Sequence, residues 1–256
     1  MGDDVSKTGL VLRRILTFCF HLGRAAGIDV RVHWSFLAAP LYIYWRFHEL
    51  GMPTVSLLIV LMLALFGCIL LHEFGHALAA RCFNVPTRDI IITPIGGMAR
   101  LVRMPIKPVE ELLITVAGPV VNLVIAGLFF LYLFLAGQPL SLLGDVQHAV
   151  KFPQLMMWAN VVLFLFNLIP AFPMDGGRIL RSSLSIFLGH QRATKAAVVV
   201  GKILAILFII ASLYFGFIWL GIVGVFVFLA AGTESAAASA AAVSESRYEE
   251  PALPFK

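Results

Sequence analysis

Long apolar runs separated by short polar segments dominate the pattern of this chain. Four of the runs cover residues 34–50, 55–80, 109–136 and 154–172. A fifth, residues 196–231, is too long for one membrane crossing, and Gly216 inside it predicts a break into two helices. Since about 20 apolar residues cross a bilayer as a helix, the pattern predicts an all-α polytopic membrane protein with about six transmembrane helices.

The polar segment between the second and third runs has a different periodicity. Residues 88–93 are rich in β-branched side chains, Pro94 interrupts them, and Gly96 and Gly97 provide a turn. Residues 98–103 then alternate apolar with polar positions. This order predicts a small β-hairpin after the second helix, with a plain loop as the alternative.

The two ends of the chain differ from the apolar middle. In residues 1–33, Arg13 and Arg14 precede an apolar stretch of only eight residues, 15–22, which is too short to span a bilayer and predicts a cytoplasmic or interfacial segment. Residues 34–232 would form the six-helix membrane domain. Residues 233–256 are rich in Ala, Ser and Glu and predict a low-complexity cytoplasmic tail, either disordered or a frayed helix.

Composition and charge support the membrane interpretation. Hydrophobic residues make up 60% of the chain and charged residues 13%, whereas soluble domains carry about 25% charged residues. The net charge of +5 does not indicate nucleic-acid binding, because the basic residues lie between the apolar runs and form no dense patch. If the N-terminus is cytoplasmic, all of the 19 Lys and Arg residues except Arg46 and Lys151 fall inside, which places both termini in the cytoplasm of a plasma-membrane protein.

The second apolar run contains an H-E-x-x-H motif, His72-Glu73-Phe74-Gly75-His76. Residues four apart share one face of a helix about 6 Å apart along its axis, so both imidazoles can reach one zinc ion. Glu73 lies beside them, where it can take a proton from water. Ionisable side chains inside a membrane span are costly and are functional candidates by default.

A catalytic zinc site uses a third protein ligand. The best candidate is Asp175, which follows a helix broken by Pro170 and Pro173 and precedes Gly176 and Gly177. Under the orientation above, the histidines and Asp175 lie at similar depth near the cytoplasmic face, so they can meet. The alternative is that Asp175 only caps the next helix.

These motifs together resemble the site-2 protease family of intramembrane zinc metalloproteases. The resemblance covers residues 28–232 and rests on paired motifs, His72-Glu73-x-x-His76 and Asn167-x-x-Pro170-x-x-Pro173-x-Asp175-Gly176. Gly118-Pro119-x-x-Asn122, Gly96-Gly97 and residues 32–36 are similar to the compact prokaryotic branch. PDZ and CBS domains, which many members carry, have no matching segment here.

The resemblance implies one zinc ion per chain, held by His72, His76 and Asp175, with Glu73 as general base. It also implies that Asn167 and Asn122 contact substrate, although Asn122 could instead form an interhelical hydrogen bond. The implied substrate is a transmembrane protein such as a membrane-tethered transcription regulator, cut within the bilayer. The alternative function is a metal-ion transporter, which is disfavoured because the other spans carry few polar side chains.

Overall fold

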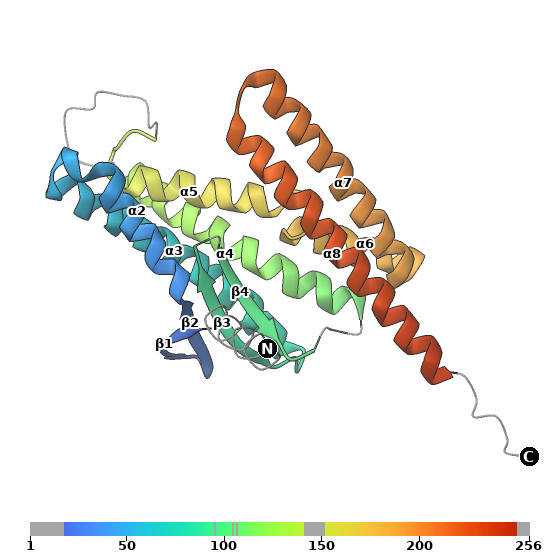
Figure 1. The fold of residues 1–256 in the computed structure, drawn as a ribbon. Helices are drawn as coiled ribbons and strands as arrows, with labels where there is room; N and C mark the ends of the chain where they lie inside the picture. Colours follow the sequence, from blue (N-terminus) through green and yellow to red (C-terminus); the bar gives the residue numbers. More distant parts are fainter. Residues whose placement is uncertain (1–17, 95, 104, 106, 141–151, 250–256) are drawn as a thin grey trace, which may run out of the picture. The chain divides into compact units, whose positions relative to one another are not determined.

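The computed structural model describes residues 18–94, 96–103, 105, 107–140 and 152–249, and helices dominate it (Figure 1). Among these residues, three helices are long and apolar enough to cross a membrane: α3 (Met52–Cys82), α4 (Pro108–Leu135) and α7 (His190–Phe215). Two apolar segments are shorter, α5 (Phe152–Asn167) and the first part, Ile218–Glu234, of α8 (Ile218–Glu249). The mostly helical membrane architecture is therefore confirmed, whereas the count of six spans is not.

The first expected span is not one continuous helix. Residues 34–50 form a 3₁₀ turn η1 (Trp34–Leu37), the ten-residue helix α2 (Ala38–Phe47) and a second 3₁₀ turn η2 (His48–Leu50). Gly51, at φ 87°, then reverses the chain into α3, a conformation that favours glycine. Tyr42 and Trp45 are exposed on α2, which suits aromatic side chains at a membrane interface.

A four-stranded sheet accompanies the helices, with strand order β1-β2-β3-β4. It comprises β1 (Cys19–Ala25), β2 (Ile28–His33), β3 (Thr87–Thr93) and β4 (Gly96–Leu101). The outer pairs are antiparallel, and β2 pairs with β3 in parallel. The segment expected as an isolated hairpin is thus one half of a larger sheet, and the expected interfacial segment 1–33 contributes β1 and β2. Residues 1–17 of that segment lie outside the described residues.

One face of the sheet packs against the C-terminal half of α3 (Figure 1). Ile28, Ile90 and Ile92 form a buried cluster with Ala77 of α3, and partly buried Phe74 completes it. Alternate residues of a strand share one face, which places Ile90 and Ile92 together toward the helix. The sheet therefore holds the part of α3 that carries the H-E-x-x-H motif.

A buried ion cluster fixes the register of β3 and β4. Asp89 on β3 has no exposed side-chain area and accepts hydrogen bonds from Nε of Arg100, at 2.6 Å, and from its Nη2. Nε of Arg31 lies 3.4 Å away. The Arg100 hydrogen bond, opposed by burial and aided by the charge of Arg100 and Arg31, holds the pKa of Asp89 below its usual value. A slip by one residue would break this pair and move every side chain to the opposite face.

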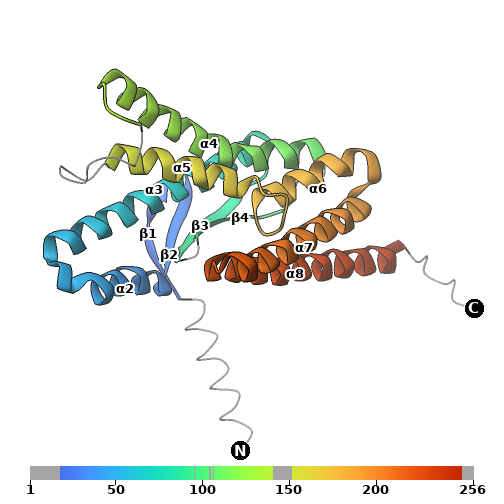
Figure 2. The same ribbon diagram turned by 90° about the horizontal axis from the view of Figure 1, so that it is seen from above.

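The chain forms two compact units, one of Met1–Met104 with Val120–Val161 and one of Pro105–Pro119 with Val162–Lys256. In the second unit, α7 and α8 run side by side as a helical hairpin (Figures 1 and 2). Gly216, at φ 73°, ends α7 in a left-handed conformation, so the long apolar run breaks at the expected glycine. Residues 233–249 of the expected tail continue α8, and residues 250–256 lie outside the described residues.

A second ion cluster lies inside the second unit. Arg181 of α6 (Asp175–Leu188) donates hydrogen bonds to Glu111 of α4 and to Glu234 of α8. Its guanidinium also lies over the ring of Phe172, 5.3 Å from the centroid. Both Arg181 and Glu111 are buried, so removing Arg181 would leave the Glu111 carboxylate buried without this partner, which is costly.

Candidate metal centre

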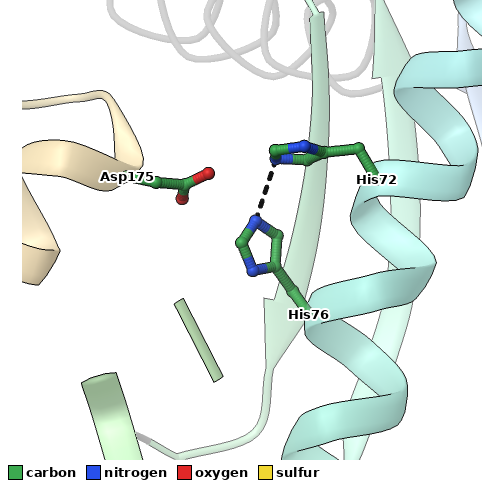
Figure 3. A group of neighbouring side chains, drawn as sticks. All are labelled: His72, His76 and Asp175. Atoms are coloured by element: carbon green, nitrogen blue, oxygen red, sulfur yellow. Dashed lines mark hydrogen bonds between the residues drawn. The ribbon is translucent and has the colours of Figure 1, made fainter. Parts of the chain in front are cut away.

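The two histidines of the motif lie one turn apart on α3. Their side chains are buried, with 5% and 6% of their area exposed for His72 and His76, and their Nε2 atoms are 3.0 Å apart (Figure 3). A helix rises 1.5 Å per residue and turns 100°, so positions four apart share a face. The predicted alignment of the two imidazoles is present in the structure.

Glu73 faces a different partner from its neighbours. Successive helix positions differ by 100°, which directs Glu73 toward the sheet, on the side of α3 that also carries Phe74 and Ala77. Its Oε2 atom accepts a hydrogen bond of 2.7 Å from the backbone N–H of Ala99 on β4. Sequence reasoning missed this contact, because it depends on the packing of the sheet against α3.

Asp175 is the first residue of α6 and is buried, with 8% exposed. The preceding loop folds back so tightly that a methyl group on Gly176 would lie 2.2 Å from the Ile169 carbonyl oxygen. On Gly177 it would lie 2.7 Å from backbone atoms of Ala171 and Phe172. The two glycines are therefore required by close backbone approach. The N-cap position is Met174, without a side-chain cap, so Asp175 does not occupy the capping position.

His72, His76 and Asp175 make up a buried group in which each residue offers one ligand atom, and these atoms lie within 4.8 Å of one another (Figure 3). Two imidazole nitrogens and one carboxylate oxygen match the donor set of catalytic zinc sites, which leave a fourth position open. The donor types and their burial therefore fit zinc.

The two predicted substrate-binding asparagines have different environments. Asn122 on α4 has 1% of its area exposed, and its Oδ1 atom has no hydrogen-bond partner within the described part of the chain. A free acceptor agrees poorly with a purely interhelical role for this oxygen. Asn167 is the last residue of α5 and is half-buried. Neither residue belongs to the metal-ligand group.

One buried polar residue near the motif was not predicted. Asn160 of α5 has no exposed area and donates from Nδ2 to the carbonyl of Met156, at 2.8 Å, and to Sγ of Cys68, at 3.4 Å. Cys68 lies one helical turn before His72, so this contact joins α5 to α3 close to the metal ligands. The signal in the sequence was a single asparagine within the apolar run 154–172.

Comparison with protein families places this chain beside a known peptidase family. The model of peptidase family M50 aligns with residues 60–151 and 143–211, which together include both histidines, Glu73 and Asp175. This segment covers more than half of the chain.

Individual proteins show the same similarity. A zinc metalloprotease of Methanocaldococcus jannaschii is 34% identical over 86% of this chain and 61% of its own length. Stage IV sporulation protein FB of Bacillus subtilis is 28% identical over 58% of this chain and 48% of its own length. The chain thus spans about 61% of the first relative. A solved site-2 protease from M. jannaschii matches with a TM-score of 0.62 and 32% identity, covering 85% of this chain and 95% of that one.

Proposed function

The chain belongs to peptidase family M50, the site-2 proteases, and from this premise we propose that it is an intramembrane zinc endopeptidase that cuts transmembrane segments of other proteins. The observation that carries the proposal is the buried group of His72, His76 and Asp175 beside Glu73. Burying His and Asp side chains among apolar helices costs free energy, so such residues are functional candidates by default.

In this proposal, His72, His76 and Asp175 hold one zinc ion per chain. Zinc in such a site acts as a Lewis acid, which makes water acidic enough to ionise near neutral pH and polarises a carbonyl group. Glu73 accepts the proton of the attacking water at its carboxylate and delivers it to the amide nitrogen that leaves. Peptide hydrolysis then needs no other acid or base from the chain.

The substrate must present an extended peptide bond to these residues. In a transmembrane helix, every carbonyl is hydrogen-bonded to the amide four residues on, so the helix has to unwind locally before hydrolysis. Asn122 and Asn167 are the proposed substrate contacts, and the buried Oδ1 of Asn122 suits a backbone N–H of the unwound segment. Membrane-tethered transcription regulators are the proposed substrates, and the lipid bilayer is the medium that both partners share.

Metal analysis tests the proposed ligands together with the activity. We expect about one zinc per purified chain in the unchanged protein, and cleavage of a reconstituted transmembrane substrate that a chelator stops and added zinc restores. His72→Ala should lose most of the zinc, whereas His48→Ala, on the exposed turn η2, should keep it. Undiminished cleavage by protein stripped of zinc would falsify the proposal.

We also propose that both termini and the metal site lie toward the cytoplasm, on the basis of the Lys and Arg distribution. In a variant with Cys19, Cys68 and Cys82 replaced by Ala, a cysteine at Arg88 on β3 should react with an impermeant maleimide only from the cytoplasmic side. A cysteine at Gln138, just beyond α4, should react only from outside. The reverse pattern would place the site at the opposite face.

A further inference from the structure

We propose that strand β4 sets the position of the Glu73 carboxylate, with the Ala99 N–H and the absent side chain of Gly97 as the two positioning elements. The inference rests on the proposed function, because it assigns a role to the general base of that reaction. It concerns residues of β4 that contact Glu73 and that the motif itself does not include.

The first element is the hydrogen bond from Ala99. It is 2.7 Å long, at the short end for an N–H donor, and it ends on Oε2. The two oxygens of the carboxylate therefore have different surroundings. With Oε2 held by the strand, Oε1 is the oxygen left to accept a proton from the attacking water.

The second element is the lack of a side chain at Gly97. A methyl group there would lie 2.6 Å from Cγ of Glu73 and 3.2 Å from both Cδ and Oε1. Real Cβ atoms essentially never approach a carbon as closely as 2.6 Å, so the Glu73 side chain would have to move. Its movement would displace the carboxylate that has to meet the water.

The strand that carries both elements is itself held in place. Gly97 pairs with Ile92 and Ala99 with Ile90, the two isoleucines that pack against α3. The Asp89–Arg100 ion pair fixes the register of the same two strands. A glutamate side chain has three rotatable bonds and would otherwise sample several rotamers, so a rigid strand is a suitable support for a catalytic carboxylate.

Two substitutions remove the elements separately. Gly97→Ala adds the obstructing methyl group, and Ala99→Pro removes the N–H on an edge strand, where proline is tolerated. Since a misplacement of about 1 Å can cost about 10²-fold in rate, we expect each to lower kcat by about 10- to 100-fold. Zinc per chain should stay within about twofold of the unchanged protein, because neither substitution touches a metal ligand. KM should also stay within about twofold, because only the chemical step is slowed.

Matched variants separate positioning from damage to the fold. Met98→Ala, at an exposed residue on the other face of β4, should retain kcat within about twofold. In a Glu73→Gln background, where no base remains to be positioned, Gly97→Ala should change the residual rate by less than about twofold. Residual cleavage is measured by mass spectrometry after long incubation.

The outcomes are distinguishable. A kcat unchanged by both Gly97→Ala and Ala99→Pro would overturn the positioning role. So would an equal fold-loss of rate when Gly97→Ala is added to Glu73→Gln, or a loss of kcat in proportion to a loss of zinc. If Glu73→Gln itself is fully active, the assignment of the general base fails instead, and with it the proposed function. A lower kcat of Gly97→Ala at normal zinc content, together with an unchanged kcat of Met98→Ala, supports the inference.

Discussion

Glu73→Gln is expected to lose proteolysis by about 10³-fold or more while keeping about one zinc per chain. Glutamine has nearly the same shape as glutamate and can still accept the hydrogen bond from Ala99 through its amide oxygen. It cannot accept a proton from water at neutral pH, so only the chemical step is removed. Zinc content and cleavage are measured on the same purified sample.

The matched control for this variant is Glu49→Gln, which makes the same chemical change on the turn η2. It should retain both zinc and activity, because Glu49 is not among the residues grouped around the motif. Full activity of Glu73→Gln would remove the general base from the mechanism. Loss of zinc together with activity would instead make Glu73 a ligand.

The second large effect is expected from Asp175→Asn. An amide oxygen is a poor zinc ligand, so the variant should fold and insert, be inactive, and bind zinc loosely or not at all. Were Asp175 only a favourable negative charge in the first turn of α6, its loss would cost about 0.3–1 kcal/mol of stability and leave zinc in place. Zinc content at a series of chelator concentrations distinguishes these results.

Near-normal zinc and activity in Asp175→Asn would require another third ligand. His190 is the next residue to replace, although it is the exposed first residue of α7 and lies outside the metal-ligand group. Asp29→Asn provides the control, because Asp29 lies on β2 and its ion pairs with His21 and Arg24 are exposed. That control should retain zinc and activity.

Local spacing explains which features could be predicted from the sequence. The alignment of His72 with His76 follows from the helical repeat alone, and the break near Gly216 follows from the length of the apolar run. The backbone freedom of Gly176 and Gly177 was also apparent, although their required proximity to residues 168–172 was not. In each case the deciding interactions lie within a few residues of one another.

Features that depend on distant partners could not be predicted in this way. β2 pairs in parallel with β3, about sixty residues later in the chain, and no local pattern specifies that pairing. β1 was part of a segment interpreted as interfacial, because its apolar stretch is short and adjoins Arg13 and Arg14. The Glu73–Ala99 contact likewise needs the sheet to pack on α3 before it can form.

The packing of the sheet on α3 also determines how the helix is turned about its own axis. The span of α3 before the motif is apolar on all sides, so lipid favours no particular rotation there. The angular setting of the histidines comes from the last turns, where Ile90 and Ile92 meet the helix and Ala99 bonds Glu73. Residues 57–65 can therefore be exchanged for other apolar residues during evolution without changing the rotation of α3, which the contacts with the sheet determine.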